Sequence, residues 1–259
     1  NFTTKVFVNG SVVGEFEGGY VPFNFDISKF LVDGENILLI QTDNTLNEST
    51  VPTHKTDWWP WGGIVGDVYL VETPNDYIRN AYLQINPDDF SQAVFKLHMA
   101  TKSSRQKVIL EIPELKYKEE FETDSSGFIQ ENIIITPELW SPSNPKLYKV
   151  IISSQNESIS DEIGFRSIKT KGQKIYLNNN EIKFKGIAMH SEPIGAPGPA
   201  FSKEHFEKLL ATATDLNINF IRAAHYPYTR HLAKVADQIG LMVWEEIPVY
   251  WNIDWENPV

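Results

Sequence analysis

The sequence contains no cysteine, which excludes disulfide bonds and thiolate metal sites. It also lacks an apolar run long enough to span a bilayer, and its start shows no charged, then apolar, then small-residue pattern. We therefore expect a soluble chain with no membrane partner and no visible secretory signal. The absence of cysteine fits a cytoplasmic or a periplasmic protein, so the compartment stays open.

Positive charge is also scarce. The chain has 23 Lys and Arg against 34 Asp and Glu, a formal net charge of -11, and no basic run interleaved with aromatic residues. This balance argues against a nucleic acid as partner. Aromatic residues, by contrast, are plentiful, with 7 Trp, 10 Tyr and 15 Phe. Such rings stack on sugars, but they also fill the cores of all-β domains, and composition alone favours the core.

Two series of short strands occupy the first two thirds of the 259 residues. In residues 1–74, KVFVNG, SVVGEFEG, YVPFNFDIS, NILLIQTDN and DVYLVET are separated by turn residues, which predicts a β-sandwich. Its first strand has no preceding turn, so we expect this sandwich to be N-terminally truncated. A second series, in residues 75–170, has the strand spacing of an immunoglobulin-like sandwich.

The hydrophobic period changes in residues 171–259. KIYLNN and EIKFKGIAMH predict a hairpin around Asn178 to Asn180, and an amphipathic helix follows from Lys203 to Leu216 with Ser202 as N-cap. The run NFIRAA is a predicted strand, Thr229 and Gly240 bound a second helix, and LMVWEEI is a third strand. This β-α-β-α-β order predicts a parallel sheet with crossover helices.

Titratable residues stand where the three predicted parallel strands end: His190, then His225, then Glu245 and Glu246. Because parallel strands share one carboxyl-terminal edge, these groups should converge, as active-site residues do in (β/α)₈ barrels. A lone histidine there would more often be a structural, hydrogen-bonded residue. Glu245 and Glu246 cannot be the acid pair of a glycosidase, because neighbours on a strand point to opposite faces.

The runs NFIRAAHYP and DQIGLMVW, within Asn219 to Trp244, resemble the signature of glycoside hydrolase family 2, the β-galactosidase and β-glucuronidase family. VFVNG and the run GIVGDVYL resemble its jelly-roll domain, and LWSPSNPKLY and GFRSI its immunoglobulin-like domain. The resemblance implies a multidomain β plus α/β fold. Its parts would be a partial jelly-roll β-sandwich (1–74), an immunoglobulin-like β-sandwich (75–170) and the first three βα units of a TIM barrel (171–259), C-terminally truncated.

The same resemblance assigns roles to individual residues. It implies that Asp57, His190 and His225 bind substrate, with Ser191 standing where the family usually has a Glu after the first histidine. The supporting residues that it implies are Arg222, which needs a carboxylate partner if buried, and Tyr226, Glu246 and Trp251. Four tryptophans could stack on sugars or pack between domains: Trp58, Trp59, Trp61 and Trp251.

No cofactor or metal is expected. In magnesium-dependent relatives a carboxylate and a histidine follow the third strand, whereas Tyr250 and Asn252 stand here. We therefore do not carry the magnesium site over. The catalytic acid/base and nucleophile, two glutamates in this family, are expected downstream, with none in this chain.

The expected function is that of a fragment of a retaining exo-β-glycosidase acting on terminal non-reducing β-linked sugars, as a β-galactosidase or, next, a β-glucuronidase. Its partner would be a glycoside, oligosaccharide or polysaccharide, and the intact enzyme could be a homo-oligomer. The alternative is a non-catalytic carbohydrate-binding or structural β-sandwich module.

The first prediction is that these 259 residues alone have no glycosidase activity, because three barrel strands leave an open edge and no acid pair. Assays with nitrophenyl β-galactoside and β-glucuronide should stay at background. Turnover that scales with protein and disappears in Glu246→Gln would show that the catalytic carboxylates lie within this chain.

Overall fold

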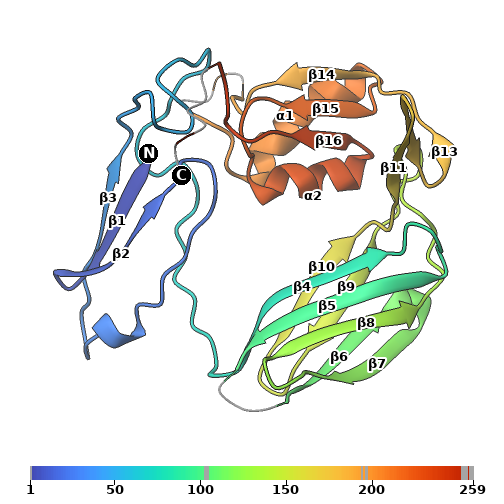
Figure 1. Ribbon diagram of the computed structural model, residues 1–259, viewed down its shortest axis with the longest axis horizontal. Coiled ribbons are helices and arrows are strands. Elements are labelled where there is room, and N and C mark those ends of the chain that lie inside the picture. The colour runs from blue at the N-terminus through green and yellow to red at the C-terminus, as the bar shows by residue number, and fades with distance from the viewer. Residues whose placement is uncertain (1, 102–104, 194, 196–197, 252–255, 257–259) are drawn as a thin grey trace. The chain divides into compact units, whose positions relative to one another are not determined.

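The computed structural model describes residues 2–101, 105–193, 195, 198–251 and 256. They form two compact units, whose elements are labelled in Figure 1. The first unit holds Asn1–Val68, Gly186–Ala236 and Met242–Val259, and the second holds Tyr69–Lys185 and Asp237–Leu241. Each unit therefore combines segments that are distant in the sequence.

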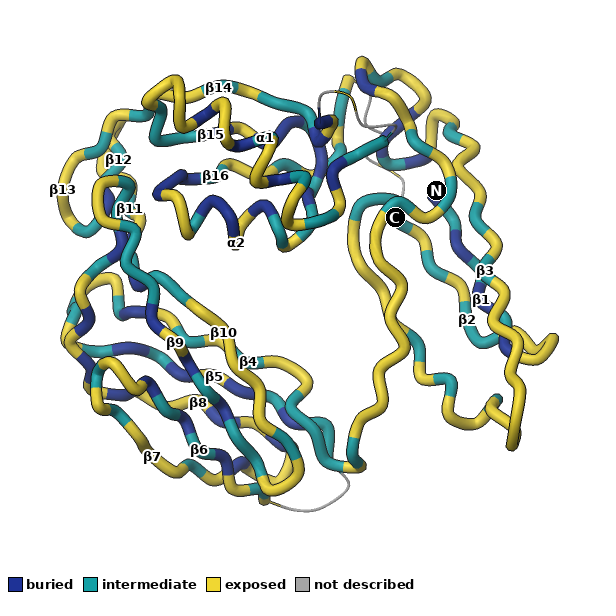
Figure 2. The backbone as a smooth tube through the Cα atoms, turned by 180° about the vertical axis from the view of Figure 1, so that it is seen from behind, coloured by how far each residue is buried: buried dark blue, intermediate teal, exposed yellow. Residues whose placement is uncertain are grey.

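An immunoglobulin-like β-sandwich makes up most of the second unit. One antiparallel sheet has the order β4-β5-β8 and the other β10-β9-β6-β7. Buried residues alternate with less buried ones along β5, as Figure 2 shows, because successive side chains of a strand point to opposite faces. The strands are β4 (Tyr77–Ile85), β5 (Gln92–Ala100), β6 (Lys107–Ile112), β7 (Tyr117–Glu122), β8 (Phe128–Ile134), β9 (Tyr148–Ser153) and β10 (Ser158–Ile163).

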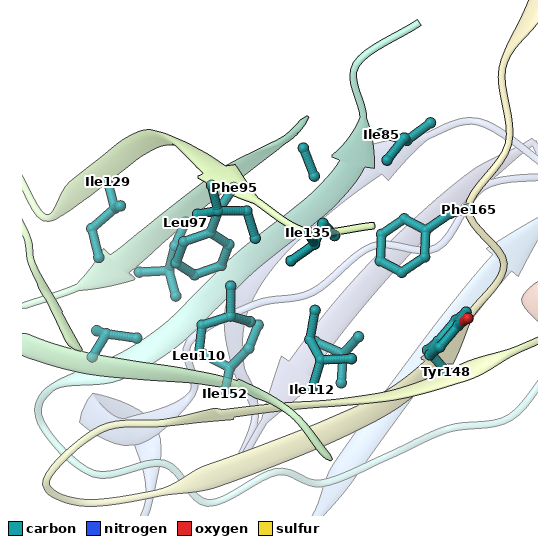
Figure 3. Close-up of a cluster of buried hydrophobic side chains, with 14 of the residues drawn as sticks. Ile85, Phe95, Leu97, Leu110, Ile112, Ile129, Ile135, Tyr148, Ile152 and Phe165 are labelled. Carbon is teal, nitrogen blue, oxygen red and sulfur yellow. The ribbon is translucent and has the colours of Figure 1, made fainter. Parts of the chain in front are cut away.

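The core of this sandwich draws on both sheets. Figure 3 shows Phe95 and Leu97 of β5 together with Leu110 of β6 and Ile152 of β9. Burying each such side chain stabilises the fold by about 1.5–3 kcal/mol relative to leaving it exposed. The prediction of an immunoglobulin-like sandwich from strand spacing is confirmed.

A small sheet of order β11-β12-β13 follows the sandwich. Its strands are β11 (Ile168–Lys171), β12 (Lys174–Leu177) and β13 (Asn180–Glu181). Asn178 and Asn179 have φ angles of 51° and 64°, the left-handed values that a two-residue hairpin turn requires. The predicted hairpin is confirmed, but its second strand does not run on to His190. It ends at Glu181, and β14 (Gly186–Met189) belongs to the first unit.

Two residues of the family-like signature, Asp237 and Gly240, have structural contacts in the second unit. The indole of Trp140, which is fully buried, donates to the Asp237 carbonyl at 2.8 Å. Arg166 lies over the Trp140 ring at 4.3 Å and donates to Asp237 Oδ1 at 2.6 Å. Burial raises the pKa of Asp237, and Arg166 opposes that rise. This cluster joins the segment Asp237–Leu241 to the rest of the unit.

The first unit begins with a three-stranded antiparallel sheet of order β2-β1-β3. The strands are β1 (Thr3–Val8), β2 (Ser11–Glu17) and β3 (Leu38–Asp43), and a single 3₁₀ turn spans Ser28–Phe30. The predicted strands at 20–28 and 67–73 are wrong, because the structure has no strand in either segment. Alternating apolar residues form a strand only beside a partner, and Leu70 is left 82% exposed.

The other part of this unit consists of the first three βα-type strands and their two helices. After β14 come α1 (Lys203–Asp215), β15 (Phe220–Ala223), α2 (Arg230–Ile239) and β16 (Met242–Glu245). Strand β15 pairs in parallel with both β14 and β16, as the β-α-β-α-β pattern predicts, and Figure 1 shows the helices beside these strands.

Local helix signals have mixed outcomes. Ser202 caps α1 as predicted, since its Oγ accepts from the His205 N–H at 3.3 Å. Leu216, the predicted last residue of this helix, is its C-cap beyond Asp215 and is exposed. Thr229 precedes α2, but its buried Oγ1 has no hydrogen-bond partner among the described residues, so the predicted side-chain cap does not form. None of the described helices is long and apolar enough to cross a membrane.

The second prediction concerns Gly240, whose φ is +80° and where a Cβ would lie 2.4 Å from the Pro142 carbonyl oxygen. Gly240→Ala should lower the free energy of unfolding by roughly 2–5 kcal/mol, through left-handed strain plus this clash. Gly172→Ala is the matched control, because Gly172 has a φ of +61° and open space around it. Equal losses for both variants in denaturant unfolding would contradict the proposed clash.

Candidate functional site

The carboxyl-terminal ends of β14, β15 and β16 bring together four polar residues, called here the strand-end cluster: His190, Arg222, His225 and Glu246. The register aligns Met189, Ala223 and Glu245 at one edge of the sheet. The rings of His190 and His225 are 5.5 Å apart, and His225 Nδ1 lies 3.1 Å from Glu246 Oε2. Strand direction alone therefore brings the predicted groups into contact.

Arg222 and Glu246 form a two-point ion pair. Arg222 Nε lies 2.5 Å from Glu246 Oε1, and Arg222 Nη2 lies 3.1 Å from Oε2. The hydrogen bond from Arg222 lowers the pKa of Glu246, with a smaller contribution from His225, while desolvation opposes the change. The arginine side chain is 45% exposed, so the expected carboxylate partner is present but the arginine is not buried.

The adjacent acids Glu245 and Glu246 have different surroundings. Desolvation raises the pKa of Glu245, while a hydrogen bond from the backbone N–H of Tyr228 lowers it. Glu246 instead contacts Arg222 and His225. The expectation that only one of the two acids reaches the cluster is confirmed.

Asp57 lies beside this cluster although it is far away in sequence. The Tyr250 hydroxyl donates to Asp57 Oδ2 at 2.7 Å. The Tyr250 ring lies 4.8 Å from the His225 ring and 5.2 Å from that of Trp58, and Trp58 and His225 are 5.6 Å apart. Three rings in mutual contact thus connect the Asp57 loop to the end of β15.

Tyr226 packs next to the strand-end cluster, with its ring centroid 6.3 Å from that of His190. It is buried, and it stacks on Tyr20 at 4.6 Å and on Tyr228 at 5.4 Å. Its hydroxyl accepts from the Ser191 N–H at 3.3 Å, and burial raises its pKa to about 12. A phenol of this kind stays protonated at neutral pH and orders its neighbours without itself titrating.

The tryptophans divide into packing and exposed residues. Trp58 is 7% exposed and donates from its indole to the Tyr20 hydroxyl at 2.8 Å, so it packs inside the unit. Trp59 and Trp251 are 67% and 79% exposed, and their rings are accessible. The Trp61 indole lies 3.4 Å from Glu192 Oε1.

His190 and Ser191 differ in their contacts. His190 Nδ1 is buried and has no hydrogen-bond partner among the described residues, although the ring lies 6.3 Å from Tyr226. Ser191 is buried, and its Oγ donates to the Ala200 carbonyl at 3.3 Å. Ser191, at the position where the resemblance implies a glutamate, is therefore occupied in backbone contacts, and Glu192 is exposed.

The residues that the structure describes contain no group of side chains that could bind a metal ion: no three His, Asp or Glu side chains among them are grouped so that they could hold one. Tyr250 points its hydroxyl at Asp57, and Asn252 lies outside the described residues.

Sequence reasoning did not predict that the Tyr250 hydroxyl contacts Asp57 or that Tyr20 stacks on Tyr226. Tyr250 contacts a residue 193 positions earlier, and no spacing rule predicts such a contact. The aromatic residues Tyr250 and Trp251 after the third strand were the available signal, and they did not identify the partner.

Models of a single protein family match nearly the whole chain. The sugar binding domain of glycosyl hydrolases family 2 matches residues 1–74, a second family 2 model matches 76–166, and the TIM barrel domain matches 168–254. The chain belongs to glycosyl hydrolases family 2. Its fold is therefore a jelly-roll sandwich region, an immunoglobulin-like sandwich and the opening βα units of a TIM barrel.

Individual relatives carry two kinds of name. A Formosa agariphila protein provisionally named a β-glucuronidase is 29% identical over 262 residues, which cover 96% of this chain and 32% of that protein. A β-galactosidase of Thermoanaerobacter pseudethanolicus is 28% identical over 273 residues, 98% of this chain and 36% of that protein. This family 2 chain thus spans about a third of the length of these relatives.

A solved structure supports the fold independently. The crystal structure of Parabacteroides merdae β-glucuronidase aligns with a TM-score of 0.82 at 22% identity, over 95% of this chain and 34% of that one. The TM-score of 0.82 establishes a shared fold, and at 22% identity the likeness carries the fold alone.

The third prediction is that Arg222→Met raises the pKa of Glu246. In the wild-type protein this pKa is lowered, so the ion pair stabilises the fold above the ordinary glutamate value of about 4.3. That stability is lost as the pH falls through the lower, folded-state pKa. Denaturant unfolding should show a modest deficit for Arg222→Met at pH 7 that shrinks below about pH 4.

Arg105→Met is the matched control, because Arg105 forms an exposed pair with Glu122 at 3.2 Å. We expect Arg105→Met to change the free energy of unfolding only slightly at every pH tested. A deficit of Arg222→Met that does not change with pH would show that the arginine acts by packing and not by charge.

Proposed function

We propose that this chain supplies part of the substrate site of a retaining exo-β-glycosidase, which releases terminal non-reducing β-linked sugars. The observation that carries the proposal is the joining of Asp57 to the strand-end cluster of a family 2 chain. Under this proposal Asp57, His190 and His225 bind the sugar, and Arg222, Tyr226, Glu246 and Trp251 support them. The three domains would span 1–74, 75–170 and 171–259.

Hydrogen bonding explains why these residue types suit a sugar. An ionised carboxylate accepts two hydrogen bonds from neighbouring hydroxyls, and Asp57 is exposed at the edge of the cluster. His225 offers a second ring nitrogen, because its Nδ1 faces Glu246. Exposed rings such as Trp251 can stack on the C–H face of a pyranose.

The chemistry of retention requires two carboxyl groups about 5–5.5 Å apart, one as nucleophile and one as acid and then base. The acid needs a raised pKa, whereas Arg222 lowers that of Glu246, and Glu245 lies apart from the cluster contacts. We therefore assign both catalytic roles to residues outside this chain. Glu246 instead orients Arg222 and His225.

The charge of the cluster favours a neutral sugar over a uronic acid. A glucuronide carries a carboxylate that a cation should meet. Arg222 is the permanent cation of the strand-end cluster, and Glu246 already occupies its guanidinium. We therefore place a β-galactoside first and a β-glucuronide second, although relatives with both names resemble this chain.

The fourth prediction is tested in the full-length protein. His225→Ala should lower kcat/KM by the cost of a hydrogen bond to a charged group, roughly 1.5–3 kcal/mol, because the residue positions substrate and transfers no proton. His205→Ala is the control, since His205 lies on α1 against Phe201 and outside the cluster.

Leaving groups distinguish the possible roles of His225. A dinitrophenyl glycoside needs no protonation, so a binding role predicts similar losses on dinitrophenyl and alkyl glycosides. Near-normal rates on the dinitrophenyl substrate, with failure on the alkyl one, would make His225 the acid. A full-length protein that binds sugars without turning over any glycoside would favour the carbohydrate-binding alternative.

A further inference from the structure

Tyr250 touches three parts of the proposed sugar site. Its hydroxyl donates to Asp57, its ring lies 4.8 Å from that of His225, and the edge-to-face contact with Trp58 spans 5.2 Å. The proposed function above assigns a role to Asp57 and His225 and leaves Tyr250 without one.

The Asp57 carboxylate needs an external group to fix its direction. Asp57 is exposed and lies in a stretch without regular secondary structure. Among the described residues, its hydrogen-bond donor is the Tyr250 hydroxyl, which takes Oδ2 and leaves the lone pairs of Oδ1 for another donor. A sugar hydroxyl has the chemistry that such an oxygen accepts.

Tyr250 is itself held in place. Its ring lies at 67° to that of Trp58 and at 82° to that of Trp251, the edge-to-face arrangement that aromatic pairs favour. Trp58 is buried and hydrogen-bonded to Tyr20, so the tyrosine ring rests on a fixed surface. The hydrogen bond to Asp57 raises the pKa of Tyr250, which keeps the phenol in its donating form.

We propose that Tyr250 is a positioning and specificity-determining residue, which holds Asp57 Oδ2 so that Oδ1 meets one hydroxyl of the terminal sugar. The proposal rests on the proposed glycosidase function. Recognition of that sugar hydroxyl by Asp57 then depends on the phenol of Tyr250, which lies in the segment after β16. A tyrosine that only filled space would leave this selectivity unchanged.

The fifth prediction compares wild-type and Tyr250→Phe full-length protein on nitrophenyl β-galactoside and its monodeoxy analogues. Tyr250→Phe keeps the ring contacts and removes the donor. We expect kcat/KM on the parent glycoside to fall about 10- to 100-fold, the range for a lost hydrogen bond to a charged group. The analogue that lacks the hydroxyl read by Asp57 should be affected by less than about threefold, because that contact is already gone.

A double-mutant cycle separates positioning from packing. In an Asp57→Ala background, Tyr250→Phe should have almost no further effect on kcat/KM. Tyr82→Phe is the matched control, because it removes a tyrosine hydroxyl that accepts from Asn80 on the immunoglobulin-like sandwich. Thermal unfolding of each variant verifies that it is folded.

Each outcome bears on the proposal. A Tyr250→Phe protein that loses activity equally on every analogue, and also in the Asp57→Ala background, has lost packing, and the positioning role is wrong. Turnover by Tyr250→Phe within twofold of wild type overturns that role alone. Absence of turnover by the wild-type protein overturns the proposed function, and the role of Tyr250 with it.

Discussion

The parallel pairing of β14, β15 and β16 is the constraint on which the site depends. Strands that run in one direction end at one edge, so the residues that follow them meet without any specific attraction between them. An antiparallel β15 would have carried His225 to the opposite edge, away from His190 and Glu246. The two helices, amphipathic and correctly spaced, make that direction possible by returning the chain.

At this edge each carboxylate is paired with a hydrogen-bond donor. The Glu246 carboxylate contacts both Arg222 and His225, and its lowered pKa keeps it ionised. Its two oxygens hold the Arg222 guanidinium at two points. Asp57 takes Tyr250 in a similar way, with a neutral donor in place of a cation. Tyr226 stacks on Tyr20 and on Tyr228 and lies next to His190, so buried aromatic packing adjoins these polar contacts.

Sequence patterns within one segment predicted the secondary structure of that segment well. They did not predict which segments contact one another. The hydrophobic period located α1, and Ser202 identified its start, because both signals depend on neighbours in sequence. Residues 67–73 alternate like a strand but form none, since pairing depends on a distant partner. The predicted positions of the strand ends identified His190, His225 and Glu246 as residues that should lie close together. The hydrogen bond between Tyr250 and Asp57 could be identified only from the tertiary structure. Thr229 shows that a residue type favoured at helix N-termini does not always form the capping hydrogen bond.

Under the proposed function, Asp57 and the strand-end cluster bind one sugar together. The most direct test is a crystal structure of the full-length protein soaked with galactose. We expect a pyranose with a hydroxyl at about 3 Å from Asp57 Oδ1 and a second polar contact to His225. A sugar bound elsewhere, with Asp57 turned away from Tyr250 and the cluster empty, would contradict it.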